Sequence, residues 1–363
     1  MILFLEYSAG GQRGGEQFTR HLHSLIRSRF SRVEPAEIPL RPRELGDIIM
    51  HARISLRNVK SLKPALVVID ISSGARNILA ARWVKRHGGK VMIIVQGTRQ
   101  TYRFNNIFAR KFVLGCENHL LGLADIVFSN SQYIADYARS RSARLARIII
   151  CHPGVDIPIE NSKSEKGSDH FLEMLAVGEC TEPRKGIKYL LEALAHLSDI
   201  PIKLHLAGGY SMESHHYKVL RNILEDHHLN ENVIFHGFLD RENLNRLYRK
   251  SDIFVMPSLS EGYGLALAEA LSFGLPIVAS NVAAIPEMIS DGVNGFLVSP
   301  KNPQELASAI RKMASDSALR LRFRHDNLEQ ARRLPTWSDF EAKLDSELVP
   351  AIEQITGMKK KDL

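Results

Sequence analysis

Short apolar runs alternate with helical patterns along almost the whole 363-residue chain, and this alternation restricts the fold more than any other feature. The runs Ala65–Ile71 and Lys90–Val95 are short and rich in β-branched residues, which is typical of buried parallel strands. Patterns between the runs, such as Glu16–Phe30, place apolar side chains on one helical face. The sequence therefore predicts an α/β fold of the doubly wound kind.

The rest of the chain continues this alternation of strands and helices. We predict further strands at Ile2–Glu6, Ile126–Ser129, Arg147–Cys151, Glu173–Gly178, Lys203–Gly208, Val233–His236, Ile253–Met256 and Pro276–Ser280. We predict further helices at Phe108–Ala124, Gly186–His196, Tyr217–His227, Leu265–Phe273, Pro303–Ala314 and Thr336–Ile355.

The chain is too long for one ordinary core, so we expect two domains of roughly 150–200 residues each. The polar stretch 157–169 lacks periodicity and is interpreted as the linker. We therefore place a first domain at 1–157 and a second at 170–335. Residues 336–363 form a C-terminal helical segment with a flexible tail.

One block, residues 258–300, concentrates the candidate functional residues. A loop with glycines starts at Glu261 and runs into the helix pattern that begins at Leu265, where free backbone N–H groups favour a phosphate. Glu269 lies about two turns further, inside the helix. This arrangement suits a ligand with a diphosphate in its middle and hydroxyl-rich sugars at both ends.

With the continuation Ile285–Val298, the block resembles the E-x7-E region of retaining glycosyltransferases of the GT-B fold, in the glycosyltransferase group 1 (GT4-like) family. The resemblance implies two Rossmann-like, doubly wound domains facing a cleft, with the C-terminal helix crossing back to the first domain. It also implies that Glu261 faces the transferred sugar and that Glu269 binds the ribose of the nucleotide.

The activity implied is transfer of a hexose-type sugar, with retention of configuration, from a nucleotide-diphosphate sugar to a hydroxyl group. The first domain would bind the acceptor, which is a glycan, a lipid-linked molecule or a small molecule. The second domain would bind the sugar nucleotide, a UDP- or GDP-sugar. Three alternatives keep the fold: a nucleotide-sugar epimerase, a sugar phosphorylase, and a non-catalytic subunit that binds nucleotide sugars.

Cations are needed on the leaving diphosphate, because negative charge builds there as the glycosidic bond breaks. Arg184 and Lys185 stand where the resembled family has its R/K pair, so the resemblance assigns them to the diphosphate. The backbone that faces the phosphates is then expected at Gly262, Tyr263, Gly264 and Leu265.

A second glycine loop, with Gly10, Gly11, Gly14 and Gly15, follows the first strand. Its spacing fits neither a dinucleotide fingerprint nor a P-loop. In the resembled family this loop approaches the phosphates of the sugar nucleotide and the acceptor, and Gly15 matches the position of closest approach.

Two positions depart from the family pattern. Many members have a histidine near the reacting sugar where this chain has Gln96, which can hydrogen-bond a sugar hydroxyl but cannot titrate. We therefore treat Gln96 as a candidate on the acceptor side. Glu179 stands where some relatives place a phosphate-binding arginine, and a carboxylate cannot take that role.

No metal or other cofactor is expected. The pairs His215–His216 and His227–His228 lack companion ligands at suitable spacing, and no Asp-x-Asp motif follows a strand. The three cysteines are widely spaced, which suits a reducing cytosol, and the N-terminus lacks the features of a signal peptide.

The net charge is +8, and residues 1–166 hold about twice as many basic as acidic residues. No nucleic-acid motif accompanies this charge, so we expect no nucleic-acid partner. Basic residues between Arg53 and Lys63 lie in an amphipathic pattern that is either a helix packed on the sheet or a contact with a membrane surface. We expect a cytoplasmic protein that can lie at the inner face of the membrane.

Overall fold

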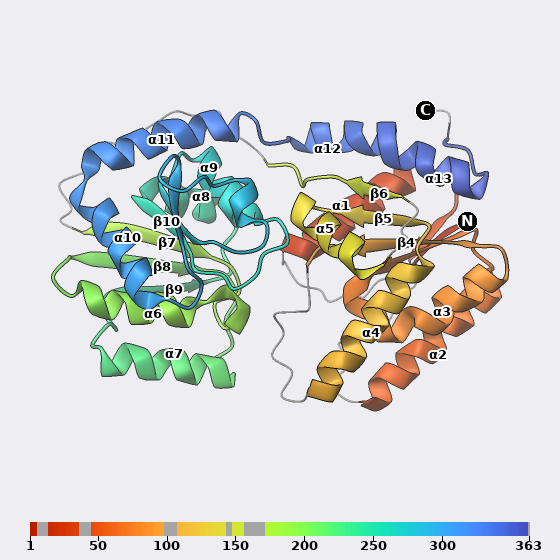
Figure 1. Cartoon of the computed structure of the whole chain (residues 1–363), viewed down its shortest axis with the longest axis horizontal. Helices are drawn as coiled ribbons and strands as arrows, with labels where there is room; N and C mark the ends of the chain where they lie inside the picture. Colours follow the sequence, from red (N-terminus) through yellow and green to blue (C-terminus); the bar gives the residue numbers. More distant parts are fainter. Residues whose placement is uncertain (6–13, 36–44, 98–106, 143–146, 156–170, 362–363) are drawn as a thin grey trace. The chain divides into compact units, whose positions relative to one another are not determined.

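The computed structural model describes residues 1–5, 14–35, 45–97, 107–142, 147–155 and 171–361. The chain divides into two compact units. Unit 1 combines Met1–Pro153 with Trp337–Leu363, and unit 2 is Gly154–Thr336. The described part of each unit contains one six-stranded sheet in which the strand pairs are parallel (Figure 1). The predicted doubly wound α/β fold is confirmed.

In unit 1 the strand order is β2-β1-β3-β4-β5-β6. The strands are β1 (Ile2–Leu5), β2 (Val33–Pro35), β3 (Leu66–Asp70), β4 (Lys90–Val95), β5 (Ile126–Ser129) and β6 (Ile148–Ile150). The helices are α1 (Gly14–Arg29), α2 (Leu45–Leu62), α3 (Gly74–Arg86), α4 (Ile107–Leu123), α5 (Gln132–Arg141), α12 (Trp337–Lys343), the π-helical turn η6 (Leu344–Leu348) and α13 (Val349–Thr356).

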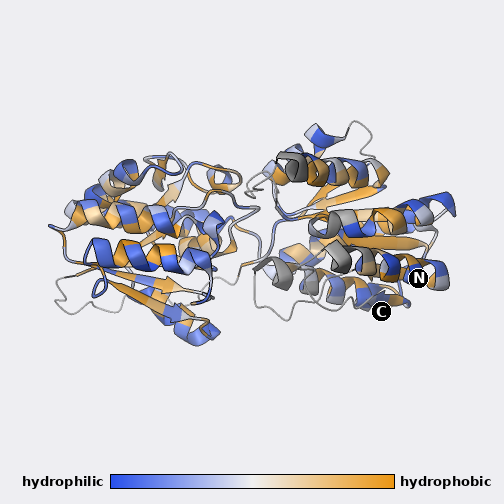
Figure 2. Ribbon diagram, turned by 90° about the horizontal axis from the view of Figure 1, so that it is seen from below, coloured by the Kyte–Doolittle hydropathy of each residue, from blue (hydrophilic) through white to orange (hydrophobic). Residues whose placement is uncertain are grey.

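Side-chain alternation along the strands divides the core of unit 1 into two layers. Met92 and Ile94 of β4 pack in a cluster with α1 and the C-terminal helices, whereas Ile93 and Val95 pack with α3, α4 and α5. The strands are buried on both faces, as expected for a parallel sheet between two helical layers. Figure 2 shows the strands as largely orange bands among helices of mixed colour.

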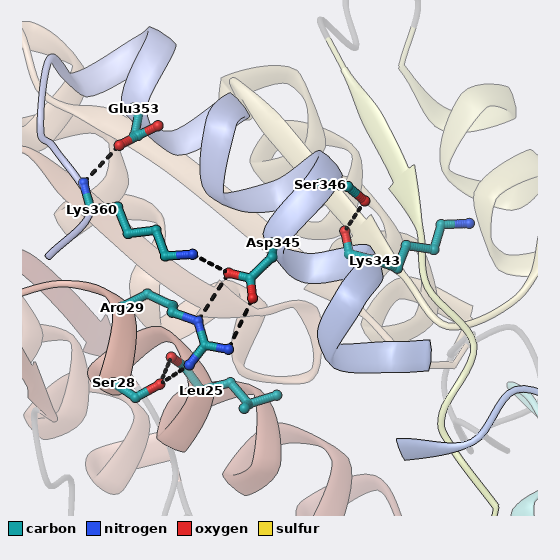
Figure 3. A network of polar contacts seen from close by, with 8 residues as sticks. All are labelled: Leu25, Ser28, Arg29, Lys343, Asp345, Ser346, Glu353 and Lys360. Carbon is teal, nitrogen blue, oxygen red and sulfur yellow. Dashed lines mark hydrogen bonds and ion pairs between the residues drawn. The ribbon is translucent and has the colours of Figure 1, made fainter. Parts of the chain in front are cut away.

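The C-terminal segment is anchored to α1. Phe340, Leu348 and Ile352 are buried in the same cluster as α1 and the sheet. Arg29 binds the Asp345 carboxylate with Nε and a second guanidinium nitrogen, each at 2.9 Å, and Lys360 Nζ lies 3.0 Å from Asp345 Oδ1 (Figure 3). The hydrogen bond from Arg29 holds the pKa of Asp345 below its usual value. The region expected to be a flexible tail thus contributes Lys360 to a defined network.

In unit 2 the strand order is β12-β11-β10-β7-β8-β9. The strands are β7 (Leu172–Val177), β8 (Ile202–Ala207), β9 (Val233–Gly237), β10 (Ile253–Met256), β11 (Ile277–Ser280) and β12 (Gly295–Val298). The α-helices are α6 (Ile187–Leu194), α7 (His215–Asp226), α8 (Arg241–Lys250), α9 (Leu265–Ser272), α10 (Pro303–Ser315) and α11 (Ser317–Ala331). Short 3₁₀ turns include η3 (Pro183–Lys185) and η5 (Ile285–Glu287).

Two short strands and several helices were not predicted. β2 has three residues, of which only Val33 is buried, so it carries no run of apolar residues. β12 contains two half-buried residues, Phe296 and Leu297, and begins with a glycine. α8 is rich in charged residues, and only Leu247 and Tyr248 are buried. The two strands are defined by their pairing with β1 and β11. Helix α8 begins at an N-cap, Asp240, whose side chain accepts a hydrogen bond from the backbone N–H of Asn243.

Basic side chains line the exposed face of α2. Arg53, Arg57 and Lys60 are exposed, and Val59 is buried against the sheet. Helices α2, α3 and α4 lie side by side along one face of the unit 1 sheet (Figure 1). None of the helices in the described part of the chain combines the length and the apolar character needed to cross a membrane.

Candidate functional site

The candidate site of unit 2 lies where the strand order reverses. The chain runs from β7 outward to β8 and β9, and then returns to β10 on the other side of β7. The connections that leave the carboxyl ends of β7 and β10 therefore run in opposite directions along the sheet. Open α/β sheets bind ligands at such a point. The loop after β7 carries Arg184 and Lys185, and the loop after β10 carries Glu261.

These loops join through a charged cluster. Lys185 Nζ lies 2.6 Å from Glu261 Oε1, and the Arg184 guanidinium lies 3.6 Å from Glu261 Oε2. The hydroxyl of Ser258 donates a hydrogen bond of 2.9 Å to Glu261 Oε1. Arg184 also donates to the carbonyl oxygen of Ser260 at 3.0 Å. The predicted diphosphate-binding cations and the predicted sugar-binding carboxylate are thus in direct contact.

The charge of Glu261 is stabilised by its neighbours. Glu261 is 7% exposed, and burial alone would raise its pKa. The charges of Lys185 and Arg184 and the hydrogen bonds from Lys185 and Ser258 outweigh that effect, so the pKa of Glu261 lies below its usual value. Glu261 is therefore an ionised acceptor of hydrogen bonds rather than a proton donor at neutral pH.

Glycine at position 186 allows the loop after β7 to lie close to the loop after β10. Gly186 has φ +69°, and a Cβ atom there would lie 1.9 Å from the carbonyl oxygen of Pro257. The β7 loop is also tied to the β10 loop by a backbone hydrogen bond of 2.8 Å from Leu259 to Arg184. A side chain at position 186 would force these two loops apart.

The start of α9 supplies the second part of the site. Gly264 precedes the helix with φ +94°, a conformation that glycine adopts without strain. The backbone N–H groups at the first positions of a helix, here Leu265 and Ala266, have no acceptor within the helix and suit a phosphate. Tyr263 is buried beside this turn, and burial raises the pKa of its hydroxyl.

Glu269 is held by two other residues. Arg241, the first residue of α8, lies 2.5 Å from Glu269 Oε1, and the hydroxyl of Tyr248 donates to Glu269 Oε2 at 2.9 Å. Tyr248 is completely buried and stacks on Phe273 with a centroid distance of 5.0 Å. Burial, followed by the charge of Glu269, raises the pKa of the Tyr248 hydroxyl, which remains a proton donor.

Three other candidates lie on other segments of the chain. Glu179 follows β7, and its carboxylate borders Gly209. Gln96 follows β4 in unit 1, and Gly15 lies in the first turn of α1. Gly10 and Gly11 lie outside the described residues.

Sequence reasoning did not find Ser258, Arg241 or Tyr248. Ser258 lies three residues before Glu261, and a hydroxyl at that spacing can reach a carboxylate within one loop. That spacing was a usable signal. Arg241 and Tyr248 reach Glu269 from α8, so only the tertiary structure reveals their contacts.

Part of the chain is similar to a known protein family. Residues 159–330 match the family described as Glycosyl transferases group 1. The D-inositol 3-phosphate glycosyltransferase of Corynebacterium efficiens is 29% identical over 245 residues, covering 64% of this chain and 58% of that protein. An uncharacterized glycosyltransferase of Methanocaldococcus jannaschii is 34% identical over 148 residues, covering 40% of this chain and 37% of that protein. The chain thus matches less than two thirds of the length of these curated relatives.

Solved structures share the fold across nearly the whole chain. HepE of Anabaena, solved in complex with UDP and glucose, has a TM-score of 0.76 at 20% identity, covering 96% of this chain and 98% of HepE. A sucrose-phosphate synthase of Thermosynechococcus elongatus has a TM-score of 0.75 at 20% identity, covering 95% and 98%. The predicted GT-B fold is confirmed. Residues 159–330 of this chain thus match the group 1 glycosyl transferases, and the chain as a whole has the GT-B fold.

Proposed function

We propose that this protein is a glycosyltransferase that moves a hexose-type sugar from a nucleotide-diphosphate sugar to a hydroxyl acceptor with retention of configuration. The curated relatives are named glycosyltransferases, and HepE was solved with UDP and glucose bound, which supports a UDP-sugar over a GDP-sugar. The observation that carries the proposal is the contact of Lys185 and Arg184 with Glu261 at the point where the strand order reverses.

In the proposed reaction, the diphosphate binds Arg184, Lys185 and the backbone N–H groups at the start of α9. These positive groups stabilise the charge that develops on the leaving phosphate as its bond to sugar C1 breaks. Lys185 has three N–H groups, so it can keep Glu261 while it binds a phosphate oxygen.

The carboxylates hold the two sugars of the substrate. Glu261, ionised and fixed by Ser258 and Lys185, accepts hydrogen bonds from hydroxyls of the transferred sugar. Glu269 accepts from the ribose hydroxyls. The acceptor oxygen bonds to C1 on the face that the phosphate leaves, and its proton passes to the departing phosphate oxygen, so configuration is retained. No protein base and no metal ion are required for this step.

We assign acceptor binding to unit 1 and place the protein at the cytoplasmic face of a membrane. The support is the row of exposed cations on α2, including Arg53, Arg57 and Lys60, next to Met50 and Leu62, which are 47% and 43% exposed. Sedimentation with vesicles of anionic and of neutral lipid tests this placement. We expect binding to the anionic vesicles, weakened when these three cations are replaced by glutamine.

Incubation with UDP- and GDP-sugars tests the reaction. Proton NMR of the product should show the anomeric configuration of the substrate, and transfer should require a hydroxyl acceptor. A product of inverted configuration would contradict the mechanism. An epimerised nucleotide sugar formed without acceptor, a requirement for free phosphate, or nucleotide binding without turnover would point to the alternative functions on this fold.

A further inference from the structure

A row of four titratable side chains crosses one face of the unit 2 sheet. Glu173 of β7 lies in its middle, with Lys250 Nζ at 2.8 Å from Oε1 and His205 Nε2 at 2.6 Å from Oε2. The other ring nitrogen of His205, which belongs to β8, lies 2.8 Å from Nε2 of His236 on β9. Glu173 and His205 are buried, whereas His236 is half-buried. The row therefore links a buried carboxylate to a histidine that protons from solvent can reach.

The contact between the two histidines holds one proton. Two imidazole nitrogens 2.8 Å apart need one N–H donor and one lone pair. His205 directs its other N–H at Glu173, which can only accept while it is ionised. Burial alone would raise the pKa of Glu173, but the bonds from Lys250 and His205 outweigh burial and keep the carboxylate ionised. If both rings carried two protons, two N–H groups would face each other and the rings would separate.

Other charged groups on this face are bound elsewhere. Lys203 lies two residues before His205 on β8, and its ammonium binds the carbonyl oxygen of Glu231 and lies over the ring of Phe171. Asp252 Oδ2 accepts from the backbone N–H of Glu173 at 2.9 Å. The charges that act on His236 are those of His205 and Lys250, which together with burial lower its pKa. A second proton therefore enters the histidine pair only below the ordinary pKa of histidine, about 6.5.

Helix α8 is tied to this row at both ends. His236 is followed by a short connection to Asp240, the residue that caps α8. At the other end Lys250, the last residue of α8, binds Glu173. The helix also packs against β7. A change in the contact between the histidines thus acts on α8 through β9 and through Lys250.

The same helix carries the partners of Glu269. Arg241, at its start, lies 2.5 Å from Glu269 Oε1, and the hydroxyl of Tyr248, in its last turn, donates to Oε2 at 2.9 Å. The orientation of the Glu269 carboxylate is therefore set by the position of α8.

We propose that the His205–His236 pair is a proton-linked switch that regulates nucleotide binding at Glu269 through helix α8. With one proton between the rings, the row holds α8 in the described position and Glu269 is oriented for the ribose. With a second proton, the rings separate, α8 shifts with Arg241, and nucleotide binding weakens. Coupling is reciprocal, so bound nucleotide must also resist the second proton. The ligand at Glu269 rests on the proposed function, whereas the switch itself rests on the histidine contact.

Calorimetric titration at pH 7.5 and 5.5 tests the switch, with UDP-glucose and GDP-mannose as probes. Both have a diphosphate esterified at each end, so they lack the terminal phosphate group that titrates near pH 6. From pH 7.5 to 5.5 the affinity of the unaltered protein should fall about fivefold more than that of His236→Gln, in which the side chain still forms hydrogen bonds but cannot be charged. His227→Gln, at the exposed end of α7, is the matched control and should behave like the unaltered protein.

The outcomes separate the switch from the proposed function. Equal falls in affinity in the unaltered protein and in His236→Gln would overturn the switch, and His236→Asn replaces that variant if it does not fold at pH 5.5. Failure of both nucleotide sugars to bind at either pH would remove the proposed function. Hydrogen exchange of residues 241–250 at pH 5.5 then tests the switch alone. It should be faster in the unaltered protein than in His236→Gln, and equal exchange would overturn the switch.

Discussion

Lys185 Nζ lies 2.6 Å from Glu261 Oε1, which joins the loop after β7 to the loop after β10 at the reversal point of the unit 2 sheet. Lys185 is also packed on Gly178, where a Cβ atom would lie 3.0 Å from Lys185 Cε. The lysine is therefore fixed by the strand end beneath it and by the carboxylate across from it. A fixed cation is prepared for a phosphate, because little reorganisation is needed when the phosphate binds.

Replacing Lys185 by methionine should lower both stability and nucleotide affinity. Glu261 would lose its nearest cation while buried, and we expect the free energy of unfolding to fall by about 3 kcal/mol. UDP affinity should fall at least tenfold. The double variant Lys185→Met/Glu261→Gln should regain most of the stability but not the UDP affinity, as followed by urea unfolding and calorimetric titration. Recovery of UDP affinity in the double variant would show that Lys185 acts only by neutralising Glu261.

Tyr248→Phe should weaken nucleotide binding through Glu269. The variant removes the hydroxyl that donates to Glu269 and retains the ring stacked on Phe273. We expect a loss of about 1 kcal/mol of stability and a fewfold rise in the Kd for UDP. Tyr137→Phe is the matched control, because Tyr137 is a buried tyrosine whose hydroxyl donates to Glu117 in unit 1. If both variants change the Kd for UDP alike, Tyr248 has no specific role in holding Glu269.

Gly186→Ala should be strongly destabilising, whereas Gly115→Ala should stabilise. Gly186 has positive φ and no room for a Cβ atom, since Pro257 O would lie at 1.9 Å. We expect a loss of at least about 2 kcal/mol. Gly115 lies inside α4 with nothing within 4 Å of an added Cβ, so alanine should add about 0.5–1 kcal/mol. Thermal unfolding of both variants measures these changes in stability. A Gly186→Ala variant as stable as the unaltered protein would contradict the described contact between the two loops.

Stability should fall as the pH drops below about 6.5. His236 Nε2 and His205 Nδ1 are 2.8 Å apart, and His205 binds the buried carboxylate of Glu173, which also pairs with Lys250. Burial, then the charges of His205 and Lys250, lowers the pKa of His236. The unfolded chain therefore takes up a proton near pH 6.5 that the folded protein resists, and stability is lost as pH falls toward the folded pKa.

Urea unfolding at pH 7.5 and 5.5 measures this effect. His236→Gln should lose less stability between the two pH values than the unaltered protein. His23 of unit 1 also has a lowered pKa, caused by burial and by Arg27, so some pH dependence should remain. An unchanged loss in His236→Gln would show that His236 does not contribute. The pKa of Glu173 is lowered too, because its bonds to Lys250 and His205 outweigh burial, and its contribution disappears only at more acidic pH.

The local sequence pattern was sufficient to predict the bounds of the central strands. β4 and β5 have the predicted bounds, Lys90–Val95 and Ile126–Ser129, because both faces of these strands are buried and their residues form continuous apolar runs followed by polar residues. The edge strand β2 has only one buried residue, Val33, so its sequence carries no such run. The edge strand β12 has an apolar run of only three residues, Phe296 to Val298, and it was not predicted. The start of α9 at Leu265 was also predictable, since the preceding glycines and the following apolar residues are local signals.

Contacts between segments that are far apart in the chain could not be predicted from the sequence alone. Lys185 and Glu261 are 76 residues apart, and their contact depends on β10 returning to the side of β7. The residue types suggested a charged site, and the resemblance to a known family assigned separate roles to the cations and the carboxylates. The direct pairing of Lys185 with Glu261, and the support of Glu269 by Arg241 and Tyr248, follow from the sheet order and the position of α8.

The decisive measurement is calorimetric titration of UDP, GDP and ADP into the unaltered protein, Lys185→Met and Tyr137→Phe. We predict that one diphosphate binds the unaltered protein and Tyr137→Phe with equal affinity and binds Lys185→Met at least tenfold more weakly. Equal affinity in all three proteins, or no binding of any diphosphate, would contradict a nucleotide-diphosphate site at Lys185 and Glu261.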